Sequence, residues 1–221
     1  MTNILEALGI DEPDTLDPTV LLGTISQISP DSALMTFADG TQAMLPISEF
    51  YAQHTWHVGD KYHVLTFERD GRRLASTVRP ELVEALYAGP VPEIRHGVVR
   101  VMSVARAAGE RTKIAVALTT EGPVDPVAAM IGREANRVNL VRAALGGERV
   151  DVIAWHEDPA IYLANALAPA RISSVEIDEN SAIVHAPAHQ MSAAVGHGGL
   201  NSQLAGQLLG LSVTVVADSQ S

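Results

Sequence analysis

The sequence of 221 residues contains no cysteine and few aromatic side chains. Without cysteine the chain can form neither disulfides nor thiolate metal sites, a composition that fits a reducing cytoplasm. Its purely apolar runs are only a few residues long, and the N-terminal segment MTNILEALGIDEPDTLD carries no basic residue. We therefore expect no signal peptide, no membrane span and a cytoplasmic location.

Basic residues are scarce and unevenly distributed. The net charge of −11 argues against a general nucleic-acid binder. Residues 79–156 carry nine acidic and ten basic residues, whereas residues 157–221 carry six acidic residues and one basic residue, Arg171. A polyanion site built on Lys and Arg must therefore rely on the middle of the chain.

Short hydrophobic runs between turn residues predict a small β-barrel over residues 18–78. Asp39-Gly40 and Gly59-Asp60 are typical turn pairs. Five strands in so short a stretch favour an OB-type barrel, with strands expected over residues 20–28, 33–38, 41–47, 61–69 and 74–78. The preceding residues 1–17, with five acidic residues and Pro13, are expected to form a partly ordered tail.

The remainder of the chain reads as two copies of one α-β-β-α-α-β unit, over residues 79–156 and 157–221. An offset of 64 positions places Gly132 on Gly196 and Leu145 on Leu209. This self-similarity indicates an internal duplication. The sequence thus predicts a multidomain α+β protein in which a barrel precedes two copies of a small α/β module.

The stretch AVGHGGLNSQLAG in the second copy places a glycine-rich hinge between two short helices. A helix–GxxG–helix hinge is typical of a KH domain, where the loop clamps about four nucleotides of a single strand. Glycines let a phosphate approach the main chain, and the next helix offers unpaired N–H groups. The alternative is a plain helix C-cap, which loses ground because the loop occurs at the equivalent place in both copies.

Several segments resemble the RNA-binding part of the NusA family of bacterial transcription factors. The resemblance rests on VPEI, VAR-x-x-GERTKIAV, DPA-x-x-x-ANALAPA and AVGHGGLN, which occur in order, and more weakly on LPISEF, VGDKY and RRLASTVRP in the barrel. It implies an S-one-type OB domain followed by two type II KH domains. It also implies a cytoplasmic protein that binds nascent single-stranded RNA and modulates pausing, termination and antitermination, with RNA polymerase and other transcription factors as partners.

The sequence departs from the family pattern at several points. The family begins with a domain that docks on polymerase, whereas only the acidic tail 1–17 precedes the barrel here, which puts the usual polymerase contact in doubt. In the first loop, GREANRV, Ala135 replaces the second glycine and Glu134 adds a negative charge. In the second loop, His197 replaces a lysine and Gln203 an arginine. A left-handed alanine and a carboxylate near phosphate each cost about 1 kcal/mol, so we expect weak RNA binding.

The predicted RNA contacts fall in three places. Phosphate ligands are expected in the first loop at Gly132, Arg133 and Arg137, and in the second at Gly196, His197, Gly198, Gly199 and Asn201. On the barrel, stacking on aromatic rings and contact with basic side chains are expected at Phe37, Tyr62, His63, Arg72 and Arg73. The alternative is that these aromatic rings are buried in the core of the barrel and do not contact RNA. Arg106, Arg111 and Lys113 form the densest basic cluster. The resemblance implies that they lie near the surface of the module, in a mixed structural and binding role.

Other chemistry finds little support in the sequence. A zinc site needs three or four converging ligands, and the pairs His54/His57 and His185/His189 do not supply them. No P-loop, GxSxG or HExxH motif is present, so we expect no enzyme, no metal and no cofactor. A second interpretation stays open, in which the acidic residues 157–221 bind a basic protein partner and the chain acts as an adaptor or competitor.

Overall fold

The computed structural model describes residues 19–51 and 55–218. The predicted acidic tail 1–17 and His54 lie outside these residues. Contacts group the chain into two compact units: the first contains residues 19–51, 55–98, 106–111 and 128–150, and the second contains residues 99–105, 112–127 and 151–218. Across the described ranges, no helix is long and apolar enough to cross a bilayer.

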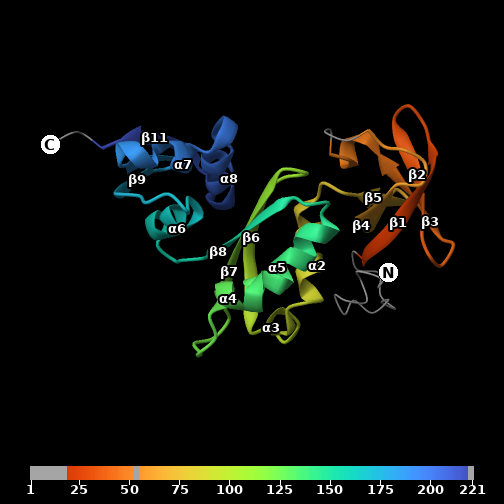
Figure 1. The fold of residues 1–221 in the computed structure, drawn as a ribbon, viewed down its shortest axis with the longest axis horizontal. Coiled ribbons are helices and arrows are strands. Elements are labelled where there is room, and N and C mark those ends of the chain that lie inside the picture. Colours follow the sequence, from red (N-terminus) through yellow and green to blue (C-terminus); the bar gives the residue numbers. More distant parts are fainter. Residues whose placement is uncertain (1–18, 52–54, 219–221) are drawn as a thin grey trace. The chain divides into compact units, whose positions relative to one another are not determined.

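The barrel predicted over residues 18–78 is present, and its strands are the red to orange arrows of Figure 1. It closes in the order β1-β2-β3-β5-β4, with strands β1 (Thr19–Ile28), β2 (Ser32–Thr36), β3 (Gln42–Pro46), β4 (Lys61–Arg69) and β5 (Arg72–Ser76). Buried and partly exposed residues alternate along β2 and β3, as expected for strands with one face on a core. A short 3-10 helix, η1 (Ile47–Glu49), follows β3.

The first α/β module has the predicted element order. Its three-stranded sheet has the order β6-β7-β8. The elements are α2 (Pro80–Ala88), α3 (Pro92–Arg95), β6 (Val99–Ala107), β7 (Arg111–Leu118), α4 (Pro126–Ile131), η2 (Arg133–Ala135), α5 (Asn136–Ala144) and β8 (Arg149–Ala154). The one-turn helix α3 was not predicted, because four residues are too few to show a helical period.

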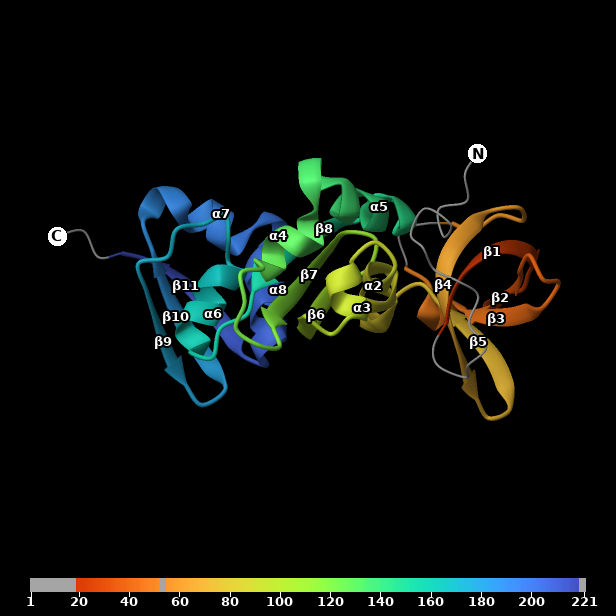
Figure 2. The same cartoon turned by 90° about the horizontal axis from the view of Figure 1, so that it is seen from below.

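The second module repeats this order within the second unit. Strand β10 lies at the centre of its sheet, parallel to β11 and antiparallel to β9, and Figure 2 shows the three longer helices on one side of this sheet. The elements are α6 (Pro159–Ala166), β9 (Ser174–Asp178), β10 (Ser181–Ala186), η3 (Ala188–Gln190), α7 (Met191–Val195), η4 (His197–Gly199), α8 (Leu200–Leu209) and β11 (Ser212–Ala217). Ala182, Val184 and Ala186 alternate with more exposed residues and form the buried face of β10.

The structure repeats at the offsets seen in the sequence. The 3-10 turns Arg133–Ala135 and His197–Gly199 lie 64 positions apart, and strands β8 and β11 lie 63 positions apart. The α+β fold predicted from the sequence, an OB-type barrel followed by two KH-type modules, is therefore confirmed.

The predicted surface position is wrong for Arg106 and Lys113, two of the three residues of the basic cluster, whereas Arg111 is partly exposed. The side chain of Arg106 is 2% exposed and that of Lys113 is fully buried. Lys113 lies on β7, where every residue from Thr112 to Val116 is buried, so a basic side chain in this stretch of the strand cannot reach solvent. Both cations are held by partners inside the protein, and neither is available to RNA.

Candidate nucleic-acid interface

Each module contains a hinge loop whose first glycine has a conformation that other residues rarely adopt. Gly132 has φ 75° and ψ 170°, and Gly196 has φ 78° and ψ 173°, a region that is essentially restricted to glycine. A Cβ atom on Gly196 would lie 2.6 Å from the Cβ of Asn201, and one on Gly132 would collide with the Asn136 side chain. The tight turn between the two helices thus requires glycine at both positions.

The residues two and three positions after these glycines also have matching backbone conformations in the two loops, although the residue types differ. Glu134 has φ 54° and ψ 29°, close to φ 58° and ψ 17° at Gly198. Ala135 has φ 59° and ψ 23°, in the same left-handed region as Gly199 at φ 81° and ψ 1°. A left-handed conformation costs a residue with a Cβ about 1–2 kcal/mol. The first loop therefore keeps the backbone of a glycine-rich loop at an energetic cost.

Substitution of Ala135 by glycine is expected to stabilise the protein by about 0.5–1 kcal/mol, because relief of the left-handed strain exceeds the extra entropy of glycine in the unfolded chain. The matched control is Ala143→Gly, the same exchange in helix α5, which is expected to destabilise by about 0.5–1 kcal/mol. Urea unfolding followed by circular dichroism measures both. A loss of stability in Ala135→Gly equal to that in Ala143→Gly would contradict strain at residue 135.

The exposed side chains of the two loops carry little positive charge. The side chain of Arg133 is 93% exposed and its Nε lies 3.8 Å from Oε1 of Glu134, which is 86% exposed. An exposed ion pair of this kind contributes little to stability. The guanidinium can therefore exchange Glu134 for a phosphate. His197 and Gly198 are exposed at the tip of the second loop. Arg133 and His197 are thus the predicted ligands that the structure leaves accessible.

Arg137 and Asn201 occupy equivalent positions, and both point back into their hinges. Arg137 Nη1 donates to the Ala129 carbonyl at 2.6 Å and to Glu93 Oε2 at 2.9 Å. Asn201 is fully buried, and its Nδ2 lies 3.1 Å from three carbonyl oxygens, those of Leu167, Ala193 and Ala194. The expectation that Asn201 faces RNA is therefore wrong. Arg137, like Asn201, donates a side-chain hydrogen bond to a backbone carbonyl of its own hinge.

The aromatic and basic candidates on the barrel have different surroundings. Phe37 is 6% exposed and belongs to the barrel core, which corrects the expectation that it stacks on a base. The guanidinium of Arg73 lies over the Phe37 ring at 5.2 Å and donates to Thr41 Oγ1 at 2.8 Å. Arg72 is exposed near the β4–β5 turn.

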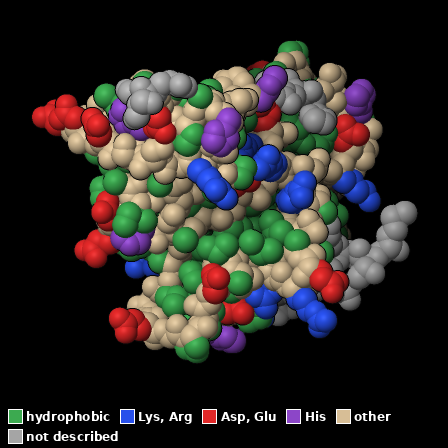
Figure 3. Space-filling model, turned by 60° about the vertical axis from the view of Figure 1, so that its left-hand side comes forward, with side chains coloured by type: hydrophobic (Ala, Val, Ile, Leu, Met, Phe, Trp, Pro, Cys, Tyr) green, Lys and Arg blue, Asp and Glu red, His purple; other side chains and the backbone are tan. Residues whose placement is uncertain are grey.

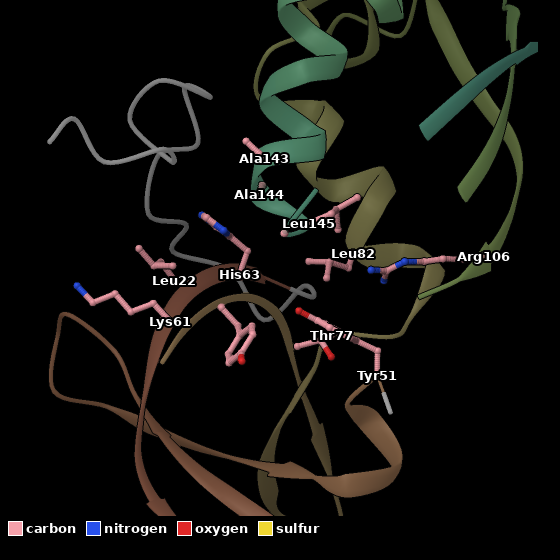
Figure 4. Close-up of a pocket in the computed structure, with 12 residues that line it drawn as sticks. Leu22, Tyr51, Lys61, His63, Thr77, Leu82, Arg106, Ala143, Ala144 and Leu145 are labelled. Carbon is pink, nitrogen blue, oxygen red and sulfur yellow. The ribbon is translucent and has the colours of Figure 1, made fainter. Parts of the chain in front are cut away.

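Tyr62 and His63 on β4 are half-buried. Tyr62 packs edge-to-face on Phe50 and donates to Asp60 Oδ2 at 3.3 Å, and burial beside Asp60 raises the pKa of Tyr62 to about 12. Burial lowers the pKa of His63, while the Ala144 carbonyl acts in the opposite direction. Both side chains line a cavity of about 300 Å³ between the barrel and helices α2 and α5 (Figure 4).

Sequence reasoning did not single out two residues that line the same cavity, Tyr51 and Lys61. Lys61 pairs with Thr24 across two strands, so the alternation of the strands could have predicted its outward position. Tyr51 follows a turn, and nothing local to the sequence indicates which way its ring points.

The charge pattern of the surface fits a weak anion site. On the face shown in Figure 3, Lys and Arg side chains lie among acidic, apolar and other side chains. Among residues 19–51 and 55–218, His, Asp and Glu side chains form no group of three that could hold a metal ion. The hinges therefore offer a ligand backbone N–H groups and a few side chains.

Comparison with known proteins yields matches over most of the chain. Residues 77–155 match the family model of the NusA-like first KH domain, and residues 159–221 match that of the NusA-like second KH domain. The transcription termination/antitermination protein NusA of Thermus thermophilus is 35% identical over 202 residues, covering 88% of this chain and 52% of the relative.

Two further NusA proteins show the same degree of similarity. That of Halalkalibacterium halodurans is 36% identical, with 81% of this chain and 48% of the relative covered. That of Bacillus subtilis is 33% identical, with 80% of this chain and 50% of the relative covered. The chain spans about half the length of the curated relatives that it matches.

Proposed function

We propose that this chain, which belongs to the NusA family and matches its portion with a barrel and two KH domains, binds single-stranded RNA and acts in transcription termination or antitermination. The observation that carries the proposal is the shared backbone of the two hinge loops. Gly132 and Gly196 agree within 3° in both φ and ψ, and the residues two and three positions later are left-handed in both loops. A retained hinge presents N–H groups to a phosphodiester in each module.

The proposed binding is weak, because few cations face the hinges. Arg133 and His197 are the accessible side chains, and Glu134 places a carboxylate beside Arg133. The predicted contacts Gly132, Gly196, Gly198 and Gly199 act through the main chain, and Arg72 and Arg73 through the barrel surface. We propose RNA polymerase and other transcription factors as partners, and no catalytic role or cofactor.

A second candidate function follows from the acidity of the second module. The Glu176 side chain on β9 is 71% exposed, and residues 157–221 carry one basic residue against six acidic ones. A surface of this sign repels phosphate and attracts a basic protein segment. On this proposal the chain acts as an adaptor or a competitor of other family members.

The test is binding of a labelled, unstructured RNA of about 20 nucleotides, followed by fluorescence anisotropy at 50 and 200 mM salt. With two or three phosphate contacts, affinity is expected to fall about 7- to 20-fold between these concentrations. Arg133→Glu is expected to weaken binding about tenfold, because it removes one cation and adds one repulsive charge.

The matched control is Arg142→Glu, which makes the same charge change at an exposed position of helix α5 and is expected to change affinity less than threefold. His197→Lys adds a permanent cation at the second hinge and is expected to strengthen binding. Absence of binding by the wild-type protein at 50 mM salt would reject the RNA proposal and favour the protein-partner candidate.

A further inference from the structure

The cavity in Figure 4 lies wholly within the first compact unit. The barrel contributes Tyr51, Tyr62 and His63, and helix α5 contributes its last turn around Ala144. A volume of about 300 Å³ is at the lower end of the range for small-molecule sites. The space therefore suits a ligand of the size of a single heterocyclic ring system.

One polar atom of a residue that lines this cavity has no hydrogen-bond partner among the residues that the structure describes. His63 Nε2 is buried without a hydrogen bond, and in Figure 4 the imidazole reaches from the barrel toward the end of helix α5. Burial lowers the pKa of His63 and so favours the neutral ring. A neutral imidazole can present either an N–H or a lone pair, and an unpaired buried nitrogen calls for a ligand or a water as its partner.

Aromatic and leucine side chains share the cavity lining with His63. Tyr51 packs so closely on the turn between β6 and β7 that a Cβ on Gly109 would lie 2.9 Å from Tyr51 Cδ2. Tyr51 also packs edge-to-face on Tyr62, with ring centroids 6.3 Å apart. Three leucine side chains also line the cavity, from β1, from α2 and from the end of α5: Leu22, Leu82 and Leu145. Thr77 and Arg106 add polar groups to the lining. A flat, largely apolar ring with hydrogen-bonding edges is complementary to such a lining.

The opening of the cavity carries a cation and leads onto a second hollow. Lys61 is exposed and lines both this cavity and a second one of about 500 Å³ on the barrel. The second cavity carries hydroxyl groups from β1 and β2, those of Thr24, Ser26 and Thr36. A single-stranded RNA that leaves the first cavity would therefore meet the Lys61 ammonium group and then a row of hydroxyl groups. These groups suit phosphate and ribose.

We propose that the cavity receives one unpaired nucleobase, with the adjoining phosphate at Lys61. The inference rests on the proposed RNA binding, since the single strand supplies the base. Neutral His63 bonds an edge of the base, and the tyrosine and leucine side chains enclose the ring. A free mononucleotide offers the same chemistry, and the experiment separates the two sources.

The test blocks the cavity without altering the hinges. Ala143 is an exposed residue of α5 that lines the cavity, so Ala143→Trp is expected to fill its opening. The matched control is Arg142→Trp, the same large ring at the neighbouring exposed position, which does not line this cavity. Affinity for the RNA of about 20 nucleotides is expected to fall about tenfold in Ala143→Trp and less than twofold in Arg142→Trp.

A second variant and a second readout identify the contact. His63→Phe keeps a ring but removes the nitrogen, and it is expected to weaken binding about threefold to tenfold. The imidazole ¹⁵N resonances of His63 in the wild-type protein are expected to shift on addition of RNA and to shift less with an RNA whose bases are removed at every position. The four ribonucleoside monophosphates serve as the free-nucleotide probe.

The outcomes separate this inference from the proposed function. If Arg133→Glu weakens RNA binding while Ala143→Trp and the His63 resonances do not respond, RNA binding stands and the base site is overturned. If the wild type does not bind RNA but a monophosphate shifts the His63 resonances and Ala143→Trp abolishes that shift, the cavity is a nucleotide site and the proposed function fails. If neither RNA nor any monophosphate shifts His63, the inference is overturned.

Discussion

Replacement of Glu148 by alanine is expected to destabilise the protein by about 3–5 kcal/mol. The Glu148 carboxylate is fully buried and accepts from Arg106 Nη2 at 2.8 Å, Arg106 Nε at 2.9 Å and the Gly109 amide at 2.9 Å. Removal of the carboxylate leaves a guanidinium that is 2% exposed without its counter-ion, and a buried unpaired charge is far more costly than the pair is stabilising. Urea unfolding measures the loss.

Two controls separate the ion pair from the mere loss of a side chain. Glu121→Ala removes an exposed glutamate and is expected to change stability by less than about 0.5 kcal/mol. The double variant Arg106→Met/Glu148→Leu removes both charges and is expected to cost much less than Glu148→Ala, because no charge is left unpaired. The Gly109 amide, which loses its acceptor, is expected to exchange faster with solvent in Glu148→Ala. A loss below about 1 kcal/mol in Glu148→Ala would show that Arg106 finds another partner.

Replacement of Lys113 by methionine is expected to destabilise the protein by about 2–4 kcal/mol. The fully buried Lys113 ammonium donates to the Ala166 carbonyl at 2.7 Å and lies 3.3 Å from Asp151 Oδ2. Ala166 is the last residue of helix α6, where the helix dipole favours a cation. Methionine fills the space of the aliphatic stem but leaves the carbonyl and the carboxylate without this donor. Differential scanning calorimetry measures the fall in Tm.

The size of the effect distinguishes charge from hydrogen bonding. Asp151 is 15% exposed, so water partly compensates its loss of a partner. Asp151→Asn keeps an oxygen acceptor near Lys113 and is expected to cost about 1 kcal/mol. If Lys113→Met raises Tm instead, the desolvation of the ammonium outweighs its bonds, an outcome that buried ion pairs in other proteins do show.

These two pairs also define a structural role for the basic residues in the middle of the chain. Arg106 holds the β6–β7 turn against the residue that precedes β8, and Lys113 joins the central strand of the first KH module to the end of helix α6 in the second. A further bond, 2.6 Å between Ser103 Oγ and Tyr162 OH, joins the neighbouring strand β6 to the same helix. Positive charge that the sequence offered for RNA is thus used to join elements of the fold.

The sequence by itself determined the order and kind of the elements. Strand β4 occupies the predicted range 61–69, and the two copies of the α/β module follow from self-similarity. These features are local: hydrophobic periodicity, turn glycines and a repeated spacing are present in short windows of sequence. The glycines of the hinges were likewise predictable, because the return of the chain at Gly132 and Gly196 is a backbone requirement.

Only the tertiary structure decided which polar and aromatic side chains can reach a ligand. Arg106 meets Glu148 across 42 positions and Lys113 meets Ala166 across 53, and Asn201 turns inward because three carbonyls converge on it. No short window contains both partners of such contacts. Burial of a side chain depends on elements that come together only on folding, whereas hydrophobic periodicity is set within each element. For this reason the position of the hinges was predictable, and the side chains that are accessible beside them were not.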